Sequence, residues 1–347
     1  MTSSPRRATL ATVAASAGVS VATVSKVLNG RSDVAPATRS MVESLLLESG
    51  YVTRSPRGAE VTVEMHVAWE LCAYSTALIK GMLEAGAETG VTVVVTVATA
   101  AGGAAPKGEL AWARGLSAAG RRAVILLDEP SPARLAALAR ARLPVVVVNP
   151  LNPPGAPMTS IGATDFYGGM SATRHLLDLG HRRIAYLGGS QTAAVNQARM
   201  HGYRAAMEAA GVPVLPGYVR AAGFCQPDAV TEGAVLLGLD PRPTAVFAFS
   251  DEIALGLVQA ARAQGLRIPE DLSVVGFDDT ELAALTSPPL TTVRQPLREM
   301  SIVALRTALR LAASEKIESH HVELATELVV RESSAPRPVA AGHDGHR

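Results

Sequence analysis

The chain has 347 residues, of which 48% are hydrophobic, so it is long enough for more than one domain and rich enough for large cores. Its net charge of +1 conceals an uneven distribution, because residues 1–60 carry seven basic and four acidic residues whereas the rest carries 25 basic and 27 acidic residues. A basic N-terminal segment ahead of a mildly acidic remainder indicates phosphate contact at one end only and excludes a uniformly basic nucleic-acid binder.

Two short helices joined by a glycine turn are predicted near the N-terminus. Apolar residues spaced at i, i+3, i+4 and i+7 predict the first helix over residues 10–17. Gly18 ends it, because glycine enters a left-handed turn without steric cost, and Ser20 is a suitable N-cap for the next helix. That helix buries Val24 and Val27 at the same spacing. A third helix is predicted over residues 36–49, so the segment forms a small helical domain.

Two other interpretations of this segment stay open at this point. A helical hairpin is often only a packing unit. Alternatively, Arg6 and Arg7 precede an alanine-rich stretch with Ala-x-Ala-like sites, as in a secretory signal, which would make the protein an exported sugar-binding protein with residues 1–30 as its signal sequence. Serine and threonine interrupt every apolar run, however, and a cleaved leader would not need a third helix.

The residues of this segment follow a specific pattern. They are Val13-Ala14, Ala17-Gly18-Val19-Ser20, Thr23-Val24-Ser25-Lys26-Val27-Leu28-Asn29-Gly30, Thr38-Arg39 and Gly50-Tyr51. Together they closely resemble the DNA-binding domain of the LacI/GalR family of bacterial transcription regulators. The resemblance implies a helix-turn-helix domain over residues 9–51, in which the first helix braces the second against the major groove of DNA.

The same resemblance implies which residues contact DNA. Bases are read by the first exposed residues of the second helix, Val21 and Ala22, and by Lys26 one turn later. Val21 and Ala22 offer only apolar contact, for example to a thymine methyl group, whereas Lys26 reaches guanine. Polar side chains around them are better placed for phosphates. The full set expected on double-stranded operator DNA is Thr9, Leu10, Ser20, Val21, Ala22, Thr23, Ser25, Lys26, Asn29 and Arg54.

Residues 52–60 are polar and are predicted to form a linker. Related repressors have a hinge here that becomes helical on DNA and inserts a leucine into the minor groove. This sequence has no leucine between Tyr51 and Val61, and Pro56 with Gly58 disfavours a helix. Because of this difference from the family pattern, we do not expect a leucine inserted into the minor groove or a kink in the operator at this point. Arg54 still offers a phosphate contact.

From residue 61 strand and helix signals alternate, which predicts parallel sheets with helices on both faces. The expected strands cover residues 61–69, 91–97, 123–127, 145–148, 183–187, 245–249 and 272–277. The expected helices cover residues 77–88, 110–118, 132–141, 165–179, 199–210 and 253–264.

Three motifs in this body carry a second resemblance. They are GHRRI at 180–184, SVVGFDD at 273–279 and PPLTTVRQP at 288–296. They are similar to the effector domain of the same family, a two-lobed α/β domain of the periplasmic-binding-protein-like (type I) fold. Three chain crossings are then expected near 161–164, 291–295 and 320–324. The implied lobes within residues 61–335 are lobe 1, about 61–162 and 292–320, and lobe 2, about 163–291 and 321–335. Residues 336–347 are expected to be a disordered tail.

Ligands of parallel α/β sheets bind at the carboxyl ends of the strands. This rule points to Asn149, Ser250 and Asp278, while Arg199 is expected to begin a helix and Gln295 lies in the second crossing. The resemblance implies that these five residues line the cleft between the lobes and hold a hydroxyl-bearing effector. An arginine with an aspartate offers donors and acceptors to a sugar.

Each of these residues also has a plain structural interpretation. Asp251 is expected to cap the helix that starts near residue 253, Asn149 could only shape its loop, and Gln295 could only bind the crossing backbone. The aromatic ring of Phe224 suits stacking on a sugar, although core packing explains it equally well.

The sequence therefore predicts a transcription regulator with a small all-α helix-turn-helix head and an α/β two-lobed effector domain. We expect a cytoplasmic homodimer that represses transcription, binds a near-palindromic operator and responds to a small-molecule effector, expected to be a sugar. No dinucleotide fingerprint, P-loop or catalytic triad order is present, so neither an enzyme nor a cofactor is predicted. Cys72 and Cys225 have no metal-ligand spacing and the apolar runs are too short for a membrane span.

Overall fold

The computed structural model describes residues 10–28, 34–48, 61–68, 71–97, 108–127, 130–150, 158–224 and 226–337. The chain divides into two compact units, Met1–Val61 and Thr62–Arg347, which we call the head and the body. The predictions for Thr9, Asn29 and Arg54, for the linker over 52–60 and for the tail beyond 337 lie outside the described residues.

The head contains the three predicted helices, α1 (Leu10–Ser16), α2 (Val21–Leu28) and α3 (Pro36–Glu48). Val13, Val24 and Val42 are buried where the three helices meet. Gly18 adopts a φ of 64°, in the left-handed region that the predicted turn requires. These observations confirm the helix-turn-helix prediction from apolar spacing and a glycine corner.

The body is built on two six-stranded sheets. The first sheet has the order β11-β5-β4-β3-β1-β2, and all its strand pairs are parallel. Its strands are β1 (Thr62–Val67), β2 (Thr92–Val97), β3 (Arg121–Leu127), β4 (Val145–Val148), β5 (Thr159–Ala163) and β11 (His321–Leu324). Continuous apolar runs such as that of β4 are typical of parallel strands, because helices cover both faces of the sheet.

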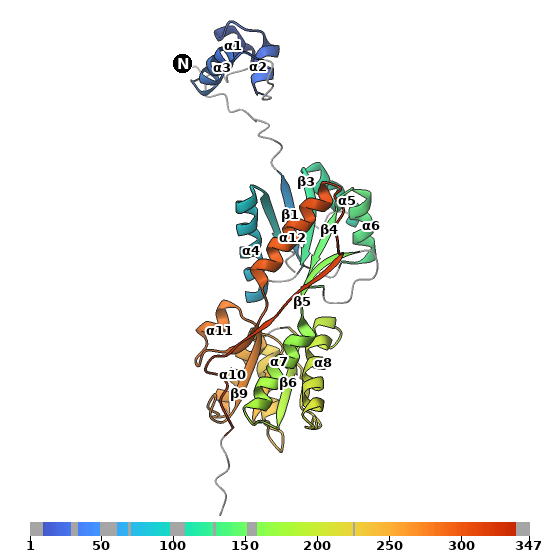
Figure 1. Cartoon of the computed structure of the whole chain (residues 1–347), viewed down its shortest axis with the longest axis vertical. Coiled ribbons are helices and arrows are strands. Elements are labelled where there is room, and N and C mark those ends of the chain that lie inside the picture. The colour runs from blue at the N-terminus through green and yellow to red at the C-terminus, as the bar shows by residue number, and fades with distance from the viewer. Residues whose placement is uncertain are drawn as a thin grey trace, which may run out of the picture. The chain divides into compact units, whose positions relative to one another are not determined.

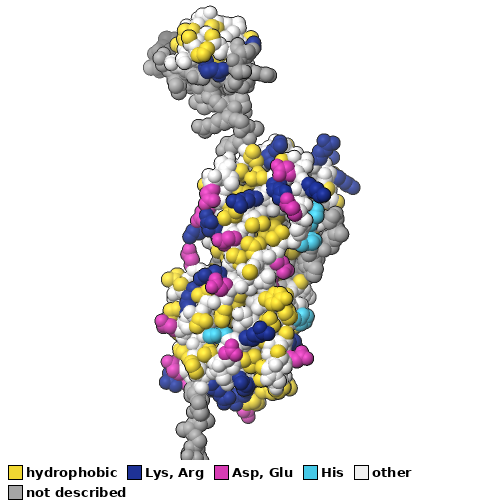
Figure 2. Space-filling model, viewed as in Figure 1, with side chains coloured by type: hydrophobic (Ala, Val, Ile, Leu, Met, Phe, Trp, Pro, Cys, Tyr) yellow, Lys and Arg dark blue, Asp and Glu magenta, His cyan; other side chains and the backbone are white. Residues whose placement is uncertain are grey.

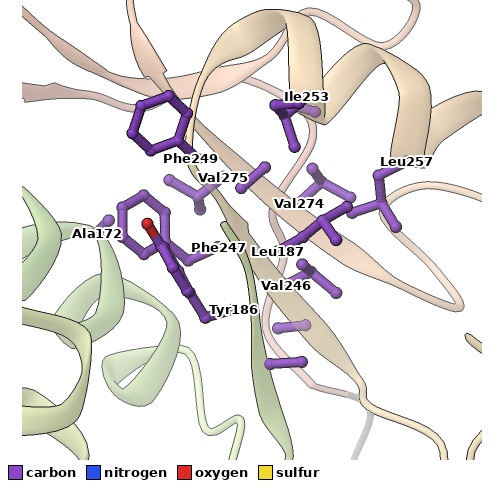
Figure 3. Close-up of a cluster of buried hydrophobic side chains, with 14 of the residues drawn as sticks. Ala172, Tyr186, Leu187, Val246, Phe247, Phe249, Ile253, Leu257, Val274 and Val275 are labelled. Carbon is purple, nitrogen blue, oxygen red and sulfur yellow. The ribbon is translucent and has the colours of Figure 1, made fainter. Parts of the chain in front are cut away.

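The second sheet has the order β12-β10-β9-β8-β6-β7, with β12 antiparallel at its edge. Its strands are β6 (Ile184–Gly188), β7 (Val219–Ala221), β8 (Ala245–Ala248), β9 (Ser273–Asp278), β10 (Thr291–Arg294) and β12 (Glu327–Val329). Figure 3 shows how its side chains alternate. Tyr186 and Phe247 lie on the side of Ala172, whereas Val246 and Val274 lie on the side of Ile253 and Leu257. The period-two alternation of a strand therefore gives this sheet two buried faces.

Helices cover both sheets (Figure 1). Those of the first lobe are α4 (Ala73–Thr89), α5 (Glu109–Ala118), α6 (Pro132–Arg140) and α12 (Leu297–Ala312). Those of the second lobe are α7 (Asp165–Asp178), α8 (Ala194–Ala209), α9 (Gln226–Leu237), α10 (Asp251–Ala263) and α11 (Glu281–Leu285). In the first lobe, α4 and α12 share one hydrophobic cluster with the sheet, and α5 and α6 share the other. Within the described segments, every helix is too short or too polar to cross a lipid bilayer.

The sheets correct the expected positions of all three crossings. Residues 161–163 and 321–324 pair within the first sheet and residues 291–294 within the second, so the crossings follow β5, β10 and β11 instead of containing them. The physical reason is that a short strand has the same local pattern whichever sheet it joins. The first and third crossings touch, since Thr326 N donates to Thr164 Oγ1 at 3.0 Å.

Two further expectations are corrected. No element was predicted for residues 226–237 and 297–312, yet they form α9 and α12. The chain also remains in contact with the body beyond residue 335, because the backbone N–H of Arg337 donates to Leu179 O at 2.9 Å. A backbone hydrogen bond to another segment is not visible in local composition, which had suggested a tail from residue 336.

Candidate functional site

The exposed side of α2 carries the residues predicted to read bases. Val21 is 47% exposed, and Ala22 and Lys26 are exposed as well, while Val24 and Val27 on the opposite side are buried in the head core. Ser20 caps the helix, because its Oγ accepts a hydrogen bond from Thr23 N at 3.0 Å. The geometry thus presents a small apolar pair and a lysine one turn apart on the outer face of α2.

Three other predicted DNA contacts of the head are less accessible, whereas Ser20 is exposed. Thr23 and Ser25 are half-buried, and Leu10 packs partly buried against the head core. On the face of the body shown in Figure 2, described Lys and Arg side chains are interspersed with Asp and Glu, so that face carries no single-sign patch suited to a phosphate backbone.

In the body, Arg199 is the centre of a buried polar cluster. The prediction that it begins a helix is wrong, because α8 starts at Ala194 and Arg199 lies in its second turn. Its side chain is 2% exposed. Arg199 Nε donates to Asp165 Oδ1 at 2.7 Å, and Nη1 donates to Phe249 O at 2.6 Å and lies 3.4 Å from Asp278 Oδ1. The cluster therefore joins α7, α8 and the ends of β8 and β9.

Aromatic rings enclose the same guanidinium. Its carbon lies 3.6 Å from the ring centroid of Phe277 and 4.5 Å from that of Phe249. Such stacking is favourable for a guanidinium removed from water. Phe224 continues the series, since its ring lies 5.7 Å from Phe249 while the side chain is 46% exposed. Phe224 is thus placed to offer an accessible aromatic face beside the cluster.

Two glycines allow α7 and α8 to approach closely enough for this arrangement. A Cβ at Gly169 would lie 2.3 Å from Arg199 O, and one at Gly202 would lie 2.1 Å from Phe166 O. Both obstacles are backbone atoms that no rotamer change can move. The small residues therefore bring Arg199 against Asp165, the first residue of α7.

Asp278 ends β9 and joins the cluster to the second crossing. Its Oδ1 accepts a hydrogen bond from Gln295 Nε2 at 2.7 Å in addition to facing Arg199. Burial raises the pKa of the Asp278 and Asp165 carboxyls, and the nearby Arg199 opposes that rise in both. Asp278 has a φ of 107°, an unusual backbone conformation for a residue with a side chain, of the kind that is often found at functional sites.

The expectation that Asp251 caps α10 is wrong, because Ser250 caps this helix instead. Ser250 is the N-cap of α10, because its Oγ accepts from Ile253 N at 3.2 Å. Asp251 is fully buried and accepts from Thr280 N at 2.8 Å and from Thr292 Oγ1 at 2.6 Å. Asp251 therefore ties β10 and the N-cap residue of α11 to α10, and burial raises the pKa of its carboxyl.

The first lobe contributes Asn149 and Tyr74. Asn149 has a φ of 47°, and its backbone N–H donates to Ile161 O at 2.7 Å. Tyr74 lies in the first turn of α4, and its buried hydroxyl makes no hydrogen bond of standard geometry within the described part of the chain. Burial raises the pKa of Tyr74, and Asp278 and Asn149 are among the groups that act on it. The Tyr74 hydroxyl therefore lies near polar groups of both lobes.

A second buried polar atom shares this property. Gln295 is 2% exposed, and its Oε1 has no hydrogen-bond partner among the described residues. Buried polar atoms are rarely left unpaired, because each costs about 1–3 kcal/mol. Tyr74 Oη and Gln295 Oε1 are therefore suited to a ligand that supplies hydrogen-bonding groups of its own. The described residues contain no His, Cys, Asp and Glu grouping suited to a metal ion.

The lobes also meet directly beside Tyr74. The backbone N–H of Ala73, the first residue of α4, donates to Glu252 Oε1 of α10 at 2.8 Å. A carboxylate is favourable at this place because the N-terminus of a helix carries partial positive charge. A second pair, Lys80 with Glu281, measures 3.3 Å but is exposed, with side chains 66% and 86% accessible. The first contact is the better protected of the two.

Sequence reasoning missed several members of this site. Asp165 and Glu252 were not predicted, and Tyr74 was named only as one of several aromatic residues that could either stack on a sugar in the cleft or pack in the core. Asp165 comes two residues after the last residue of β5, so the rule of strand carboxyl ends could have found it. The predicted residues Asn149, Arg199, Asp278, Gln295 and Phe224 are brought into one region through the contacts given above, and Ser250 lies beside it as a helix cap.

Comparisons with known proteins give one consistent result. A model described as bacterial regulatory proteins, lacI family, matches residues 9–54, and one described as a periplasmic binding protein-like domain matches residues 173–334. The HTH-type transcriptional regulator DegA of Bacillus subtilis (strain 168) is 33% identical over 340 residues, covering 95% of this chain and 99% of that protein. The HTH-type transcriptional regulator CelR of Thermobifida fusca is 35% identical over 341 residues, covering 94% and 98%.

Solved structures agree. A transcriptional regulator CelR-cellobiose complex has a TM-score of 0.70 at 32% identity and covers 94% of this chain and 100% of that chain. A lac repressor dimer bound to operator and the anti-inducer ONPF has a TM-score of 0.80 at 25% identity and covers 95% and 100%. These relatives are transcription regulators and not enzymes.

Proposed function

The chain belongs to the LacI family of bacterial regulatory proteins, and from this premise we propose that it is a repressor whose affinity for operator DNA is controlled by a sugar bound between the lobes of the body. It is a sequence-specific DNA-binding transcription regulator, and the family match over residues 9–54 favours a DNA-binding head over a signal sequence. We place it in the cytoplasm, where its operator is, and assign it no catalytic activity.

The exposed side of α2 supports the proposed base readout. Val21 and Ala22 offer apolar contact to thymine, and Lys26 offers a donor to guanine. Because lysine lacks the two-pronged geometry of arginine, its discrimination at that base is expected to be modest. Ser20 and Thr23 hold the helix end and stand near the phosphates, which fix register.

The DNA function is tested by footprinting the full chain on its own upstream region. A symmetric protected site is expected, and absence of protection at low salt would contradict the proposal. Lys26→Ala should relax the preference at one base pair of each half-site by about 1 kcal/mol, the lower end of the range for a specific base contact. Ser40→Ala, at an exposed position on α3, is the matched control and should leave the preference unchanged. An unaltered preference in Lys26→Ala removes that residue from readout.

One observation carries the effector proposal. Among the described residues, Gln295 Oε1 of the second crossing is buried without a hydrogen-bond partner next to the Arg199–Asp278 cluster. Tyr74 Oη of the first lobe is buried there too, with the Asn149 side chain acting on it. Hydroxyl groups of a sugar would satisfy both atoms, and the exposed ring of Phe224 would stack on the apolar face of the sugar. The cellobiose complex of the related regulator CelR supports a saccharide as the ligand class.

Thermal unfolding against a panel of sugars tests the site. A sugar that binds the folded chain raises its Tm by mass action. The same sugar should stabilise Asp278→Ala much less, and Tyr74→Phe, which removes only one hydroxyl, should weaken binding by an intermediate amount. If all three proteins are stabilised equally, the ligand binds elsewhere.

We further propose that two copies act together. Two heads related by a twofold axis fit a near-palindromic operator, and the lac repressor dimer on its operator supports this assembly. A ligand that changes the relation between the lobes would change how the two heads are held, which couples the two sites. Binding to an isolated half-site as tight as to the full operator would contradict the dimer.

A further inference from the structure

We propose that helix α7, together with strand β12, forms a surface through which two copies of this chain pack against each other, separate from the interface that pairs the two heads. The contact is made by one side of α7, which we call the α7 stripe and which consists of Tyr167, Met170, Ser171, Arg174, His175 and Asp178. This inference goes beyond the proposed function and takes from it only the operator-binding dimer, which the α7 stripe would join into a tetramer.

The α7 stripe is the open side of a helix whose other side is buried. Ala172 is buried against the second sheet, whereas Tyr167 is 64% exposed and Arg174 and Asp178 are exposed as well. The residues of the stripe follow one another at steps of three, one, three, one and three positions, which keeps them on one side of a helix. Together with Leu328 of β12 they line a shallow hollow of about 250 Å³. The surface is therefore continuous across α7 and β12.

This surface contains residue types that protein interfaces favour. The stripe contributes a tyrosine, a methionine and an arginine, all of which are enriched at interfaces. The ring of Phe166 meets that of Tyr167 edge to face, with 5.5 Å between the ring centroids, and both side chains are exposed. Val330, which follows β12, is exposed as well. A group of exposed apolar side chains with charged neighbours marks a site of association.

The stripe matches a second copy of itself when the two helices lie antiparallel. A twofold axis that passes between Ala172 and Thr173 brings the N-terminal half of one α7 against the C-terminal half of the other. Each residue of the stripe then faces a different residue of the second copy. The facing pairs are Tyr167 with Asp178, Met170 with His175, and Ser171 with Arg174.

Each facing pair is chemically complementary. The hydroxyl of Tyr167 can donate a hydrogen bond to the carboxylate of Asp178, and the guanidinium of Arg174 can donate to the hydroxyl of Ser171. The third pair places a thioether against an imidazole ring, and sulfur packs favourably against aromatic rings. None of the three pairs brings like charges together, and a twofold interface contains each pair twice.

The charges of the stripe favour a second copy over a partner of uniform charge. Arg174 and Asp178 make no ion pair within the described part of the chain, although they lie four residues apart on one side of the helix. Burial lowers the pKa of His175, so its ring adds no charge at neutral pH. A uniformly acidic or basic partner would meet one opposite charge and one like charge, whereas an antiparallel second copy presents a neutral hydrogen-bonding group to each.

The stripe lies on one side of the second lobe, and α11 lies on the other. Figure 3 shows Ala172 of α7 and Ile253 of α10 on opposite sides of the second sheet. Helix α11 lies beside α10, because its N-cap residue Thr280 donates a backbone hydrogen bond to Asp251, the first residue of α10. Helices α7 and α11 can therefore contact different copies of the chain.

A second group of exposed apolar side chains spans both lobes. Leu83 of α4 and Leu285 of α11 are exposed, and Lys80 pairs with Glu281 at 3.3 Å between the same two helices. Since α4 belongs to the first lobe and α11 to the second, copies that pair here would respond to the arrangement of the lobes. We place the pairing of the heads on this side, which leaves the α7 stripe for the further contact.

Sedimentation of the full chain tests this surface. We expect the wild type to form tetramers at micromolar concentration, and Tyr167→Asp, which sets two carboxylates against each other, to dissociate to dimers. Loss of such a contact raises a dissociation constant at least about tenfold, and the contact occurs twice in a twofold interface, so we expect at least about 100-fold. Val235→Ser, at an exposed apolar position of α9, is the matched control and should leave the tetramer intact.

Exchanging two facing residues tests the antiparallel pairing. The double variant Tyr167→Asp with Asp178→Tyr rebuilds the same facing pair from the opposite sides, because each residue now occupies the position of the other. It should recover the tetramer to within about tenfold of the wild-type dissociation constant. A role of Tyr167 in the fold of its own lobe would not be restored by this exchange.

The outcomes separate this inference from the proposed function. A wild-type chain no larger than a dimer overturns the inference and leaves the operator-binding dimer in place. A monomeric Tyr167→Asp variant shows that the stripe pairs the heads, which overturns the separate interface. A tetramer that Tyr167→Asp leaves intact, or that the exchange does not recover, overturns the antiparallel contact. If the tetramer responds to both variants as expected but footprinting finds no operator, the proposed function fails and the inference stands.

Discussion

A methyl group at Gly202 should separate α7 from α8 and disturb the Arg199 cluster. A Cβ there would lie 2.1 Å from Phe166 O and 2.7 Å from Met170 N, whereas ordinary contacts begin at 3.4 Å. Because both obstacles are backbone atoms, the helices must move apart by about an ångström. Arg199 lies three residues earlier on the same helix, and its 2.7 Å bond to Asp165 cannot survive such a shift unchanged.

The magnitude follows from two opposing effects. Overpacking a well-packed contact costs about 1–3 kcal/mol, and weakening a buried ion pair adds to this, up to about 3–5 kcal/mol if one partner is lost. Replacing glycine by alanine within a helix stabilises the folded state by about 1 kcal/mol, which opposes these losses. We therefore expect Gly202→Ala to lower the free energy of unfolding of the body by about 3 kcal/mol, which corresponds to roughly 6–12 °C in Tm.

The control is Gly115→Ala in α5, where an added Cβ would meet nothing within 4 Å. This variant should be neutral or stabilised by up to about 1 kcal/mol. Calorimetric unfolding of the two variants and the wild type measures the difference. Equal Tm values for Gly202→Ala and Gly115→Ala would refute the argument that the glycine contact positions Arg199.

Three further substitutions test separate contacts of the body. Burial raises the pKa of Asp278 from 3.8 to about 8, so between these pH values the folded state binds more protons than the unfolded state, and the free energy of unfolding should fall as pH rises. Asp278→Asn should flatten that slope in Tm measured against pH. Ser250→Ala removes the cap of α10 and should lower the free energy of unfolding, measured in urea, by about 1 kcal/mol. Ser131→Ala, which removes the cap of α6, should lower it by a similar amount, but only Ser250→Ala should also alter sugar binding. Glu252→Ala should weaken sugar binding several-fold by releasing the start of α4, whereas Glu281→Ala, which removes an exposed pair, should not; calorimetric titration that finds both equal would contradict the difference.

The head could be predicted almost completely from the sequence. Its helices, the left-handed glycine at 18 and the cap at Ser20 depend on neighbours within a few residues, so the local pattern determines them. The alternation of strands and helices in the body was predictable for the same reason. The amphipathic spacing of α12 was also present in the sequence, since Leu297, Met300 and Ala304 face the same core, but it had not been assigned.

The parts that could not be predicted depend on contacts between distant segments. Nothing local in β10 or β11 tells which sheet each strand joins, because the partner strands lie far away in the chain. Likewise, the exchange of roles between Ser250 and Asp251 is decided by Thr280 and Thr292, which reach Asp251 from other elements. The resemblance to a family placed five ligand candidates, and the rule of strand carboxyl ends could have added Asp165, whereas Glu252 required the folded arrangement.

The first turn of α4 connects ligand binding to the arrangement of the lobes. The backbone N–H of Ala73 donates to Glu252 of the second lobe, and Tyr74, the next residue, has its buried hydroxyl at the effector site. Among the described residues, Gln295 Oε1 is buried without a hydrogen-bond partner, which costs about 1–3 kcal/mol. A ligand hydroxyl that donates to Gln295 Oε1 removes this cost in the present arrangement of the lobes, and a ligand shifts an equilibrium between two arrangements only by binding one of them more tightly. The effector should therefore select the arrangement of lobes described here, with α4 as the element that both the ligand and the second lobe hold.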